Sequence, residues 1–197
     1  TSIKISPSSQ YFVTSSQKEF VSAVWAVGVN YRSKPFYILE GGVGAGFVDN
    51  ATVVTASSHC LRLYVDVEPH TEDKNHKLVD FCTGDNADKW IEKELPHEER
   101  TNKGQLTCLA VCNKVFKGFC AVGDTFGYVR LYGLGTVRKR ELYPLGDVWR
   151  DHRDAITCLA FSNDGHNLAT GSKDMTVRIY SIEVKTAKQQ LGQTGIR

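Results

Sequence analysis

Apolar and polar residues alternate along most of this chain in short runs, and residues typical of turns separate the runs. The last unit of the pattern has alternating runs at residues 156–161, 167–171 and 176–182, with the turn sequence Asn163-Asp164-Gly165 between the first two. A period of two is typical of β-strands with one buried face. Glycine takes positive φ without strain, and Asn or Asp can bond its own backbone, so this turn sequence suits a tight connection. The pattern predicts an all-β chain.

Two short segments recur along the chain. The sequence Leu-Thr-Cys-Leu-Ala at residues 106–110 returns as Ile-Thr-Cys-Leu-Ala at residues 156–160. The sequence Tyr-Val-Arg-Leu-Tyr at 128–132 returns as Thr-Val-Arg-Ile-Tyr at 176–180, and Cys-Leu-Arg-Leu-Tyr at 60–64 is a third copy. Such recurrence indicates a repeat architecture, in which each unit buries its apolar surface against its neighbours.

The chain divides into four such units, which we expect at residues 1–40, 41–82, 105–146 and 147–197. Between the second and third units lies the charge-rich segment 83–104, which we expect to be an exposed loop with a short helix over 87–95. The expected strands are 3–6, 11–14, 21–27 and 36–39 in the first unit; 45–48, 52–56, 61–67 and 78–82 in the second; 106–111, 119–122, 128–134 and 141–144 in the third; and 156–161, 167–171, 176–182 and 188–191 in the fourth.

The fourth unit resembles a WD repeat almost position by position. Asp151-His152 precedes its first strand, Leu168-Ala169-Thr170-Gly171-Ser172-Lys173-Asp174 spans the second strand and the next turn, and Val177-Arg178-Ile179-Tyr180 forms the third strand. The resemblance implies a WD-repeat β-propeller, with about four blades of a larger propeller in this chain. It also implies a structural network of hydrogen bonds formed by His152, Thr170 or Ser172, and Asp174, with Tyr180 in place of the family's Trp.

The other three units depart from the WD pattern. The third unit has Asp124 but no matching His, the second has His59 in place of the turn Asp, and the first keeps Trp25 alone. Divergent blades are common in the family, so these departures leave the expected fold unchanged.

Within the WD-repeat proteins, residues 121–132 and 154–174 look like the echinoderm microtubule-associated protein-like family. That resemblance implies a protein that binds tubulin or decorates microtubules, including the axonemes of cilia. We therefore expect a non-enzymatic protein-interaction scaffold in the cytoplasm, on the cytoskeleton or in the axoneme, with tubulin or axonemal complexes as partners. The alternative is a generic WD-repeat adaptor in a ubiquitin-ligase, trafficking or ribosome-assembly complex.

The charge balance gives no general field that would attract nucleic acid or a membrane, because 24 Lys and Arg face 22 Asp and Glu for a net charge of +2. Charged partners must then be met by local patches. The candidate contacts are the basic run Arg138, Lys139 and Arg140, with Arg150 nearby, and the tryptophans Trp90 and Trp149 beside charged segments. In the alternative interpretation, the basic run is a solvated edge and the two tryptophans pack under loops, without a partner.

No motif in the chain indicates catalysis, and we expect no catalytic residues, cofactor or small-molecule substrate. The glycine run at residues 41–46 is followed by another strand, so no helix N-terminus is available to hold a phosphate. We expect no metal site, because Cys108 and Cys112 would lie about 13 Å apart along a strand. The six cysteines are expected to be buried free thiols in a reducing cytoplasm.

Overall fold

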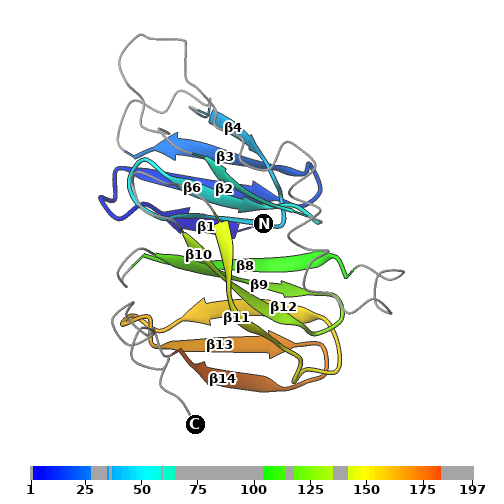
Figure 1. Ribbon diagram of the computed structural model, residues 1–197. Helices are drawn as coiled ribbons and strands as arrows, with labels where there is room; N and C mark the ends of the chain where they lie inside the picture. The colour runs from blue at the N-terminus through cyan, green and yellow to red at the C-terminus, as the bar shows by residue number, and fades with distance from the viewer. Residues whose placement is uncertain are drawn as a thin grey trace.

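The computed structural model describes residues 2–27, 35, 37–58, 60–64, 104–113, 118–134 and 142–182. These residues form strands and no helix, which confirms the all-β prediction. The strands build four antiparallel sheets that follow one another in chain order, from blue to orange in Figure 1. Each sheet is a meander, since strands that are consecutive in sequence pair with each other.

The first two sheets cover residues 2–64. Sheet 1 contains β1 (Ser2–Ile5), β2 (Tyr11–Ser16), β3 (Val21–Ala26) and β4 (Tyr37–Glu40). Sheet 2 contains β5 (Gly44–Phe47), β6 (Val53–Ala56) and β7 (Leu61–Tyr64). The expected outer strand at 78–82 lies outside the described residues.

The last two sheets cover residues 106–181. Sheet 3 contains β8 (Leu106–Cys112), β9 (Phe119–Asp124), β10 (Val129–Leu134) and β11 (Leu142–Trp149). Sheet 4 contains β12 (Ile156–Phe161), β13 (Asn167–Ser172) and β14 (Val177–Ser181). Strand β11 is longer than the expected 141–144. The expected helix at 87–95 and the strand at 188–191 fall outside the described residues, and the unit boundaries stay a prediction.

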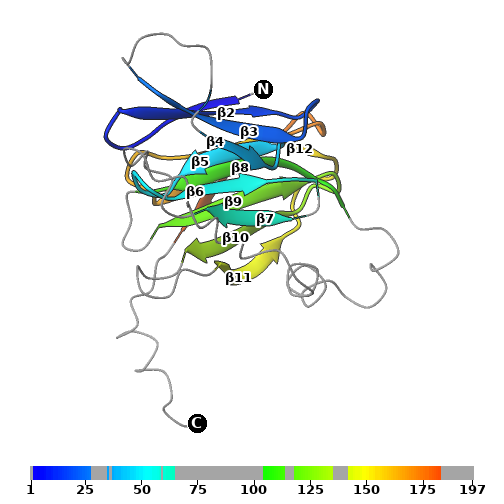
Figure 2. The same ribbon diagram turned by 90° about the horizontal axis from the view of Figure 1, so that it is seen from above.

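The first strands of the four sheets lie at the inner side of the arrangement. Strand β1 contacts β5, β5 contacts β8, and β8 contacts β12. The later strands of each sheet lie progressively farther out, as Figure 2 shows for β5, β6 and β7 and for β8 to β11. Neighbouring sheets therefore pack face to face.

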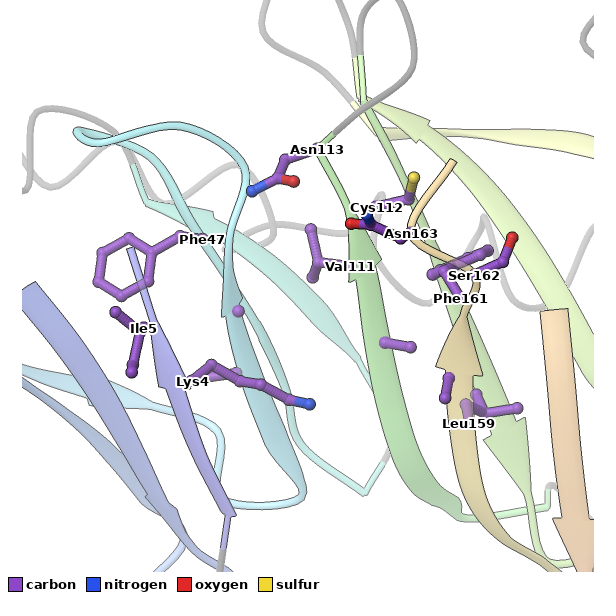
Figure 3. A pocket seen from close by; sticks show the side chains of 14 residues that line it. Lys4, Ile5, Phe47, Val111, Cys112, Asn113, Leu159, Phe161, Ser162 and Asn163 are labelled. Carbon is purple, nitrogen blue, oxygen red and sulfur yellow. The ribbon is translucent and has the colours of Figure 1, made fainter. Parts of the chain in front are cut away.

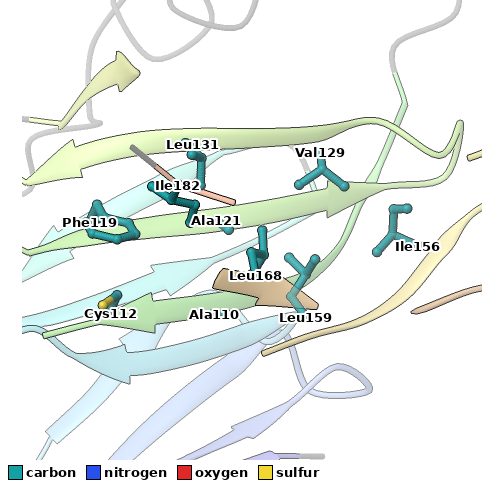
Figure 4. Close-up of a cluster of buried hydrophobic side chains, with 10 residues drawn as sticks. All are labelled: Ala110, Cys112, Phe119, Ala121, Val129, Leu131, Ile156, Leu159, Leu168 and Ile182. Carbon is teal, nitrogen blue, oxygen red and sulfur yellow. The ribbon is translucent and has the colours of Figure 1, made fainter. Parts of the chain in front are cut away.

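Three apolar clusters fill the three spaces between neighbouring sheets. The cluster between sheets 1 and 2 includes Val13, Val24 and Phe47, and the one between sheets 2 and 3 includes Val54 and Val122. Figure 4 shows the cluster between sheets 3 and 4, which comprises Ala110, Cys112, Phe119, Ala121, Val129, Leu131, Ile156, Leu159, Leu168 and Ile182. Both faces of sheets 2 and 3 are thus buried, which explains why their strands are almost continuously apolar.

Polar links supplement this packing at two of the junctions. The guanidinium of Arg62 forms an ion pair with Glu40 of the preceding sheet at 2.9 Å. The hydroxyl of Thr107 on β8 donates a hydrogen bond of 2.6 Å to the carbonyl of Ile156 on β12. Gly123 allows the close approach of sheets 3 and 4, because a Cβ at that position would lie only 2.5 Å from the Cβ of Ile156. Sheets 3 and 4 consequently approach closely where these residues meet.

The outward faces of the two end sheets are exposed. Ile3, Ile5 and Ile38 of sheet 1 are about two-thirds accessible, whereas Val177 and Ile179 of sheet 4 are 74% and 73% accessible. Interior sheets show no comparable exposure among the described residues of β5–β10. The stack therefore has two open apolar ends.

Replacement of Leu168 by Ala tests the contribution of the junction between sheets 3 and 4. Leu168 is fully buried in that cluster, so truncation should lower the free energy of unfolding by about 3 kcal/mol through lost burial and the cavity left behind. Urea titration followed by circular dichroism measures this. Met175→Ala is the control, since Met175 is 95% exposed and its truncation should change stability by less than about 0.5 kcal/mol. Equal effects of the two substitutions would contradict the packing described.

Candidate functional site

The polar network expected in the fourth unit is centred on the buried ring of His152. Its Nδ1 lies 3.0 Å from Oδ2 of Asp174, and its Nε2 lies 2.7 Å from the hydroxyl of Thr170. A carboxylate only accepts hydrogen bonds, so Nδ1 donates to Asp174. In that tautomer Nε2 accepts the hydroxyl proton of Thr170. The segment before β12 is thereby tied to the middle of β13 and to the β13–β14 turn.

Asp174 also orders the turn in which it lies. Its Oδ2 accepts a hydrogen bond from the backbone NH of Arg153, and its Oδ1 accepts one from the hydroxyl of Thr176 at 2.6 Å. The hydrogen bond from Thr176 is the main cause that holds the pKa of Asp174 well below its usual range, and the bonds from Arg153 and His152 act in the same direction. Thr176, which also lies 3.1 Å from Nδ1 of His152, is a member of the network that the sequence did not reveal.

The remaining two residues of the expected network have other contacts. Ser172 donates a hydrogen bond of 2.7 Å to the carbonyl of Asp154 and accepts one from the backbone NH of Asp174. Tyr180 stacks on Trp149 with ring centroids 4.2 Å apart. Burial, and secondarily the nearby Asp151 carboxylate, raise the pKa of Tyr180 to about 12. Ser172 thus bonds to Asp154, and Thr170 is the hydroxyl residue that bonds to His152.

Parts of the same network occur in the first sheet. The indole NH of Trp25 donates a hydrogen bond of 3.0 Å to the hydroxyl of Thr14. Thr14 and Trp25 have the same places in sheet 1 as Thr170 and Tyr180 have in sheet 4, as the strand registers show. The first unit therefore keeps the threonine position of the network as well as Trp25, whereas the sequence led us to expect Trp25 alone.

Asp124 of the third unit has a different role from Asp174. It pairs with Leu106 across β8 and β9, as Ser172 pairs with Ile156 across β12 and β13, so Asp124 is the counterpart of Ser172. Its Oδ1 accepts hydrogen bonds from the backbone NH groups of Phe126 and Tyr128. The third unit therefore orders its turn with a carboxylate but without a histidine. His59 of the second unit lies outside the described residues.

The comparisons with known proteins agree with this geometry. Residues 144–181 match the family described as "WD domain, G-beta repeat". Human WD repeat-containing protein 18 is 41% identical over 51 residues, which cover 24% of this chain and 12% of that protein. Its Bos taurus counterpart is 47% identical over 38 residues, which cover 19% of this chain and 9% of that protein. The chain therefore spans only a small part of the curated relatives it matches.

Solved structures extend the likeness to the whole chain at the level of fold. The β-propeller domain of Cps50 (Swd1) from Myceliophteria thermophila has a TM-score of 0.61 and 16% identity, over 95% of this chain and 55% of that one. The computationally designed Ika4 protein has a TM-score of 0.54 and 14% identity, over 93% of this chain and 92% of that one. The four sheets are therefore consecutive β-propeller blades, as the resemblance to WD repeats implied.

Two of the candidate partner contacts fall within the described residues. Trp149, at the end of β11, packs on Tyr180 and on the cluster between sheets 3 and 4. Arg150 is exposed and places its guanidinium carbon 5.1 Å from the centroid of the Tyr128 ring. Phe126, which is also exposed, lies 6.4 Å from that ring. We call Phe126, Tyr128 and Arg150 the aromatic–arginine patch. Arg138, Lys139, Arg140 and Trp90 lie outside the described residues, and their role stays a prediction.

A pocket of about 260 Å³ opens on the inner strands β1, β5, β8 and β12 (Figure 3). Its walls include the apolar residues Ile5, Phe47 and Val111, and Lys4 is the one charged residue among the described residues that line it. Asn113 and Asn163 contribute amides at its rim (Figure 3). Among the described residues, the lining contains no carboxylate and no imidazole.

The described cysteines do not form a reactive or metal-binding group. All five are free thiols, but Cys158 is exposed, contrary to the expectation that they would be buried. Burial raises the pKa of Cys108 to about 11 and that of Cys120 to about 12, which keeps both as thiols. Among the described residues, no cluster of three or more His, Cys, Asp or Glu could hold a metal ion. Within the same part of the chain, no helix is long and apolar enough to span a membrane.

The network makes stability depend on pH through Asp174. Because its pKa is lower in the folded chain than in the unfolded one, the ionised carboxylate stabilises the fold above about pH 4, and this contribution is lost as the pH falls through the folded pKa. Asp174→Asn should therefore melt at a lower temperature than the native chain at pH 7, and the gap should narrow on acidification. Thermal unfolding at several pH values measures it. Asp147→Asn, at an exposed position of β11, should show no such gap, and a gap for Asp174→Asn that is independent of pH would contradict the prediction.

The turn that carries Asp174 contains a strained residue. Met175 has a φ of 64° and is almost fully exposed, whereas the matching position of the third unit is Gly127 with a φ of 84°. Met175→Gly should raise the free energy of unfolding by about 0.5–1 kcal/mol. At positive φ, the steric strain that a Cβ causes in the folded chain exceeds the additional conformational entropy that glycine loses on folding. Chemical denaturation tests this. The neighbouring Lys173→Gly, where φ is not positive, should instead lower stability, and a stabilisation of similar size there would refute the explanation.

Proposed function

We propose that this chain is a non-enzymatic scaffold that holds other proteins in a complex, as a WD-repeat adaptor does. The observation that carries the proposal is the state of His152. Both of its ring nitrogens are engaged by Asp174 and Thr170, and only 4% of the residue is accessible. A histidine and a carboxylate that could serve acid–base catalysis are thus used to fix a turn.

The arrangement of blades supports a binding role. Sheets packed face to face form a rigid body with few internal freedoms, and a propeller offers its loops, sides and inner strands as separate surfaces. The inner pocket presents the ammonium of Lys4 and the amides of Asn113 and Asn163 to a bound segment. These groups suit hydrogen bonding to a peptide chain.

The aromatic–arginine patch is the surface on which we place a protein partner. Phe126 is exposed at a turn, and the guanidinium of Arg150 lies against Tyr128 from a neighbouring strand end. Aromatic residues and arginine are enriched at the centres of protein interfaces and carry much of the binding energy there. The patch thus combines the residue types of an interface centre.

A microtubule-associated or axonemal role is the finer function that was expected first from sequence, with the generic adaptor as its alternative. It depends on Arg138, Lys139 and Arg140, and neither WD repeat-containing protein 18 nor Cps50 (Swd1) is named for microtubule binding. The adaptor is therefore the proposal that we favour, with a cytoplasmic location, and the microtubule is an outcome of its test.

Affinity isolation of the tagged chain from its own cells, with quantitative mass spectrometry, tests the proposal. We expect a defined set of proteins at constant ratios, and the double substitution Phe126→Ser with Arg150→Ala should reduce their recovery at least tenfold. Phe20→Ser is the matched control, because Phe20 is an exposed aromatic residue at the β2–β3 turn of another blade. Recovery that is equal for both variants would remove the patch from the proposal.

Sedimentation with polymerised tubulin separates the two roles. The adaptor proposal predicts that the chain stays in the supernatant. If it pellets with microtubules, and if salt releases it as expected for screened basic contacts, the microtubule alternative replaces the proposal.

A further inference from the structure

The inner pocket opens at the opposite end of the blades from the aromatic–arginine patch. Strands β1, β5, β8 and β12 each end at a residue that lines the pocket, and the residues that follow β8 and β12 line it as well. The patch lies at the other end of these strands. The turn that contains Phe126 is hydrogen-bonded to Gln105, just before β8, and Arg150 lies in the connection that leads into β12. The chain therefore has two separate surfaces, one at each end of its inner strands.

Small residues on the inner strands leave the space that forms the pocket. Ala45 and Gly46 on β5, Ala110 on β8 and Ala160 on β12 all line it. Its volume of about 260 Å³ is slightly below the roughly 300–1,000 Å³ of sites that take drug-sized ligands. The pocket therefore suits a few side chains of a peptide better than a large cofactor.

The position of Lys4 is set by the packing of sheets 1 and 2. Lys4 pairs with Val13 across β1 and β2, and Val13 belongs to the cluster between these two sheets. Residues that pair directly across an antiparallel sheet share a face, so Lys4 lies on the side of β1 that faces sheet 2. In Figure 3 its side chain extends from β1 across β5 toward β8. The outward face of sheet 1 has no part in this placement.

The chemistry of the lining matches a ligand that is both acidic and apolar. Among the described residues, Lys4 forms no ion pair, and the pocket contains no carboxylate that could neutralise its ammonium. A carboxylate would gain charge-assisted hydrogen bonds there, which are roughly twice as strong as neutral ones. Phe47 and Val111 offer apolar contacts beside this charge, and Asn113 and Asn163 offer amides at the rim.

We propose that the pocket binds an acidic segment of a second protein partner. An Asp or Glu side chain of that segment pairs with Lys4, and an adjoining apolar side chain packs on Phe47 and Val111. The amides of Asn113 and Asn163 bond to its main chain. This inference rests on the scaffold function proposed above and extends it, because the patch holds one protein and the pocket holds another. The chain then joins two proteins through opposite ends of the same blades.

Fluorescence polarisation with two labelled octapeptide libraries tests the site on the 197-residue chain. The acidic library is built from Asp, Glu, Leu and Ser, and the basic library has Lys and Arg in place of the two acids. We expect the native chain to bind the acidic library alone. Lys4→Glu should weaken that binding at least tenfold and should create binding of the basic library, because the charge in the pocket is reversed. Lys4 is exposed, so circular dichroism should show unchanged folding.

Lys18→Glu is the matched control for the charge reversal. Lys18 is an exposed lysine in the β2–β3 turn, which lies at the end of sheet 1 away from the pocket. Its substitution changes the net charge by the same amount as Lys4→Glu. It should leave the dissociation constant of the acidic library within about twofold of the native value, because isolated surface charges contribute little.

The two proposals fail in different ways. An acidic library that does not bind, or one that Lys4→Glu and Lys18→Glu weaken equally, would overturn the pocket site. Loss of peptide binding in the double variant Phe126→Ser with Arg150→Ala would also overturn it, because the peptide would then occupy the patch. If proteins are still recovered through the patch when no peptide binds, the scaffold function stands without this second site. If the peptide binds at Lys4 but no defined set of proteins is recovered, the pocket site stands and the scaffold function fails.

Discussion

Face-to-face packing of sheets is the interaction on which the rest of this structure depends. A sheet with two apolar faces cannot be stable in water alone, so every interior blade requires a neighbour on each side. The requirement explains the fully buried strands β5, β6, β9 and β10 of sheets 2 and 3, and the glycine at 123 that lets Ile156 approach. Polar side chains on the strands, such as Thr107 and Thr170, form hydrogen bonds within this packing.

Within this packing of sheets, the hydrogen bonds around His152 order one local region of the fourth blade. They fix the segment that leads into β12 against the turn that leads into β14, so one buried ring orders two connections. In the third blade, Asp124 accepts hydrogen bonds from backbone NH groups of the equivalent turn, and the first blade retains the link between Thr14 and Trp25. Different blades thus keep different parts of one arrangement, because packing between the sheets supplies most of the stability that each blade needs.

Strand positions could be predicted closely because alternation and turn residues are local signals. The run 156–161 and the strand β12 coincide. The resemblance to one repeat implied a network of His152, Thr170 or Ser172, and Asp174, and the structure places Thr170 and Asp174 on the two ring nitrogens of His152. Strand β11 was underestimated, since Gly146 with its positive φ and the register shift opposite β10 interrupt the alternation that marks a strand. The counterpart of Asp124 and the partner of Trp25 depend on pairing between strands, which one sequence does not specify. Thr176 joins the network through geometry within a turn.

The two faces of sheets 3 and 4 are unlike, because one bears small residues on its first two strands and the other bears larger ones, and the order of these two blades therefore has a direction. A gene segment that encodes one blade can be duplicated or lost between two others, and each new junction still joins a small-residue face to a large-residue face. Variation in blade number then needs no newly evolved interface, and the number of units in a closed ring is limited by the angle between neighbouring blades and not by their chemistry. The corresponding rows of sheets 3 and 4, Cys-Gly-Val and Ala-Ala followed by Leu or Ile, show two neighbouring blades that carry the same small-residue face.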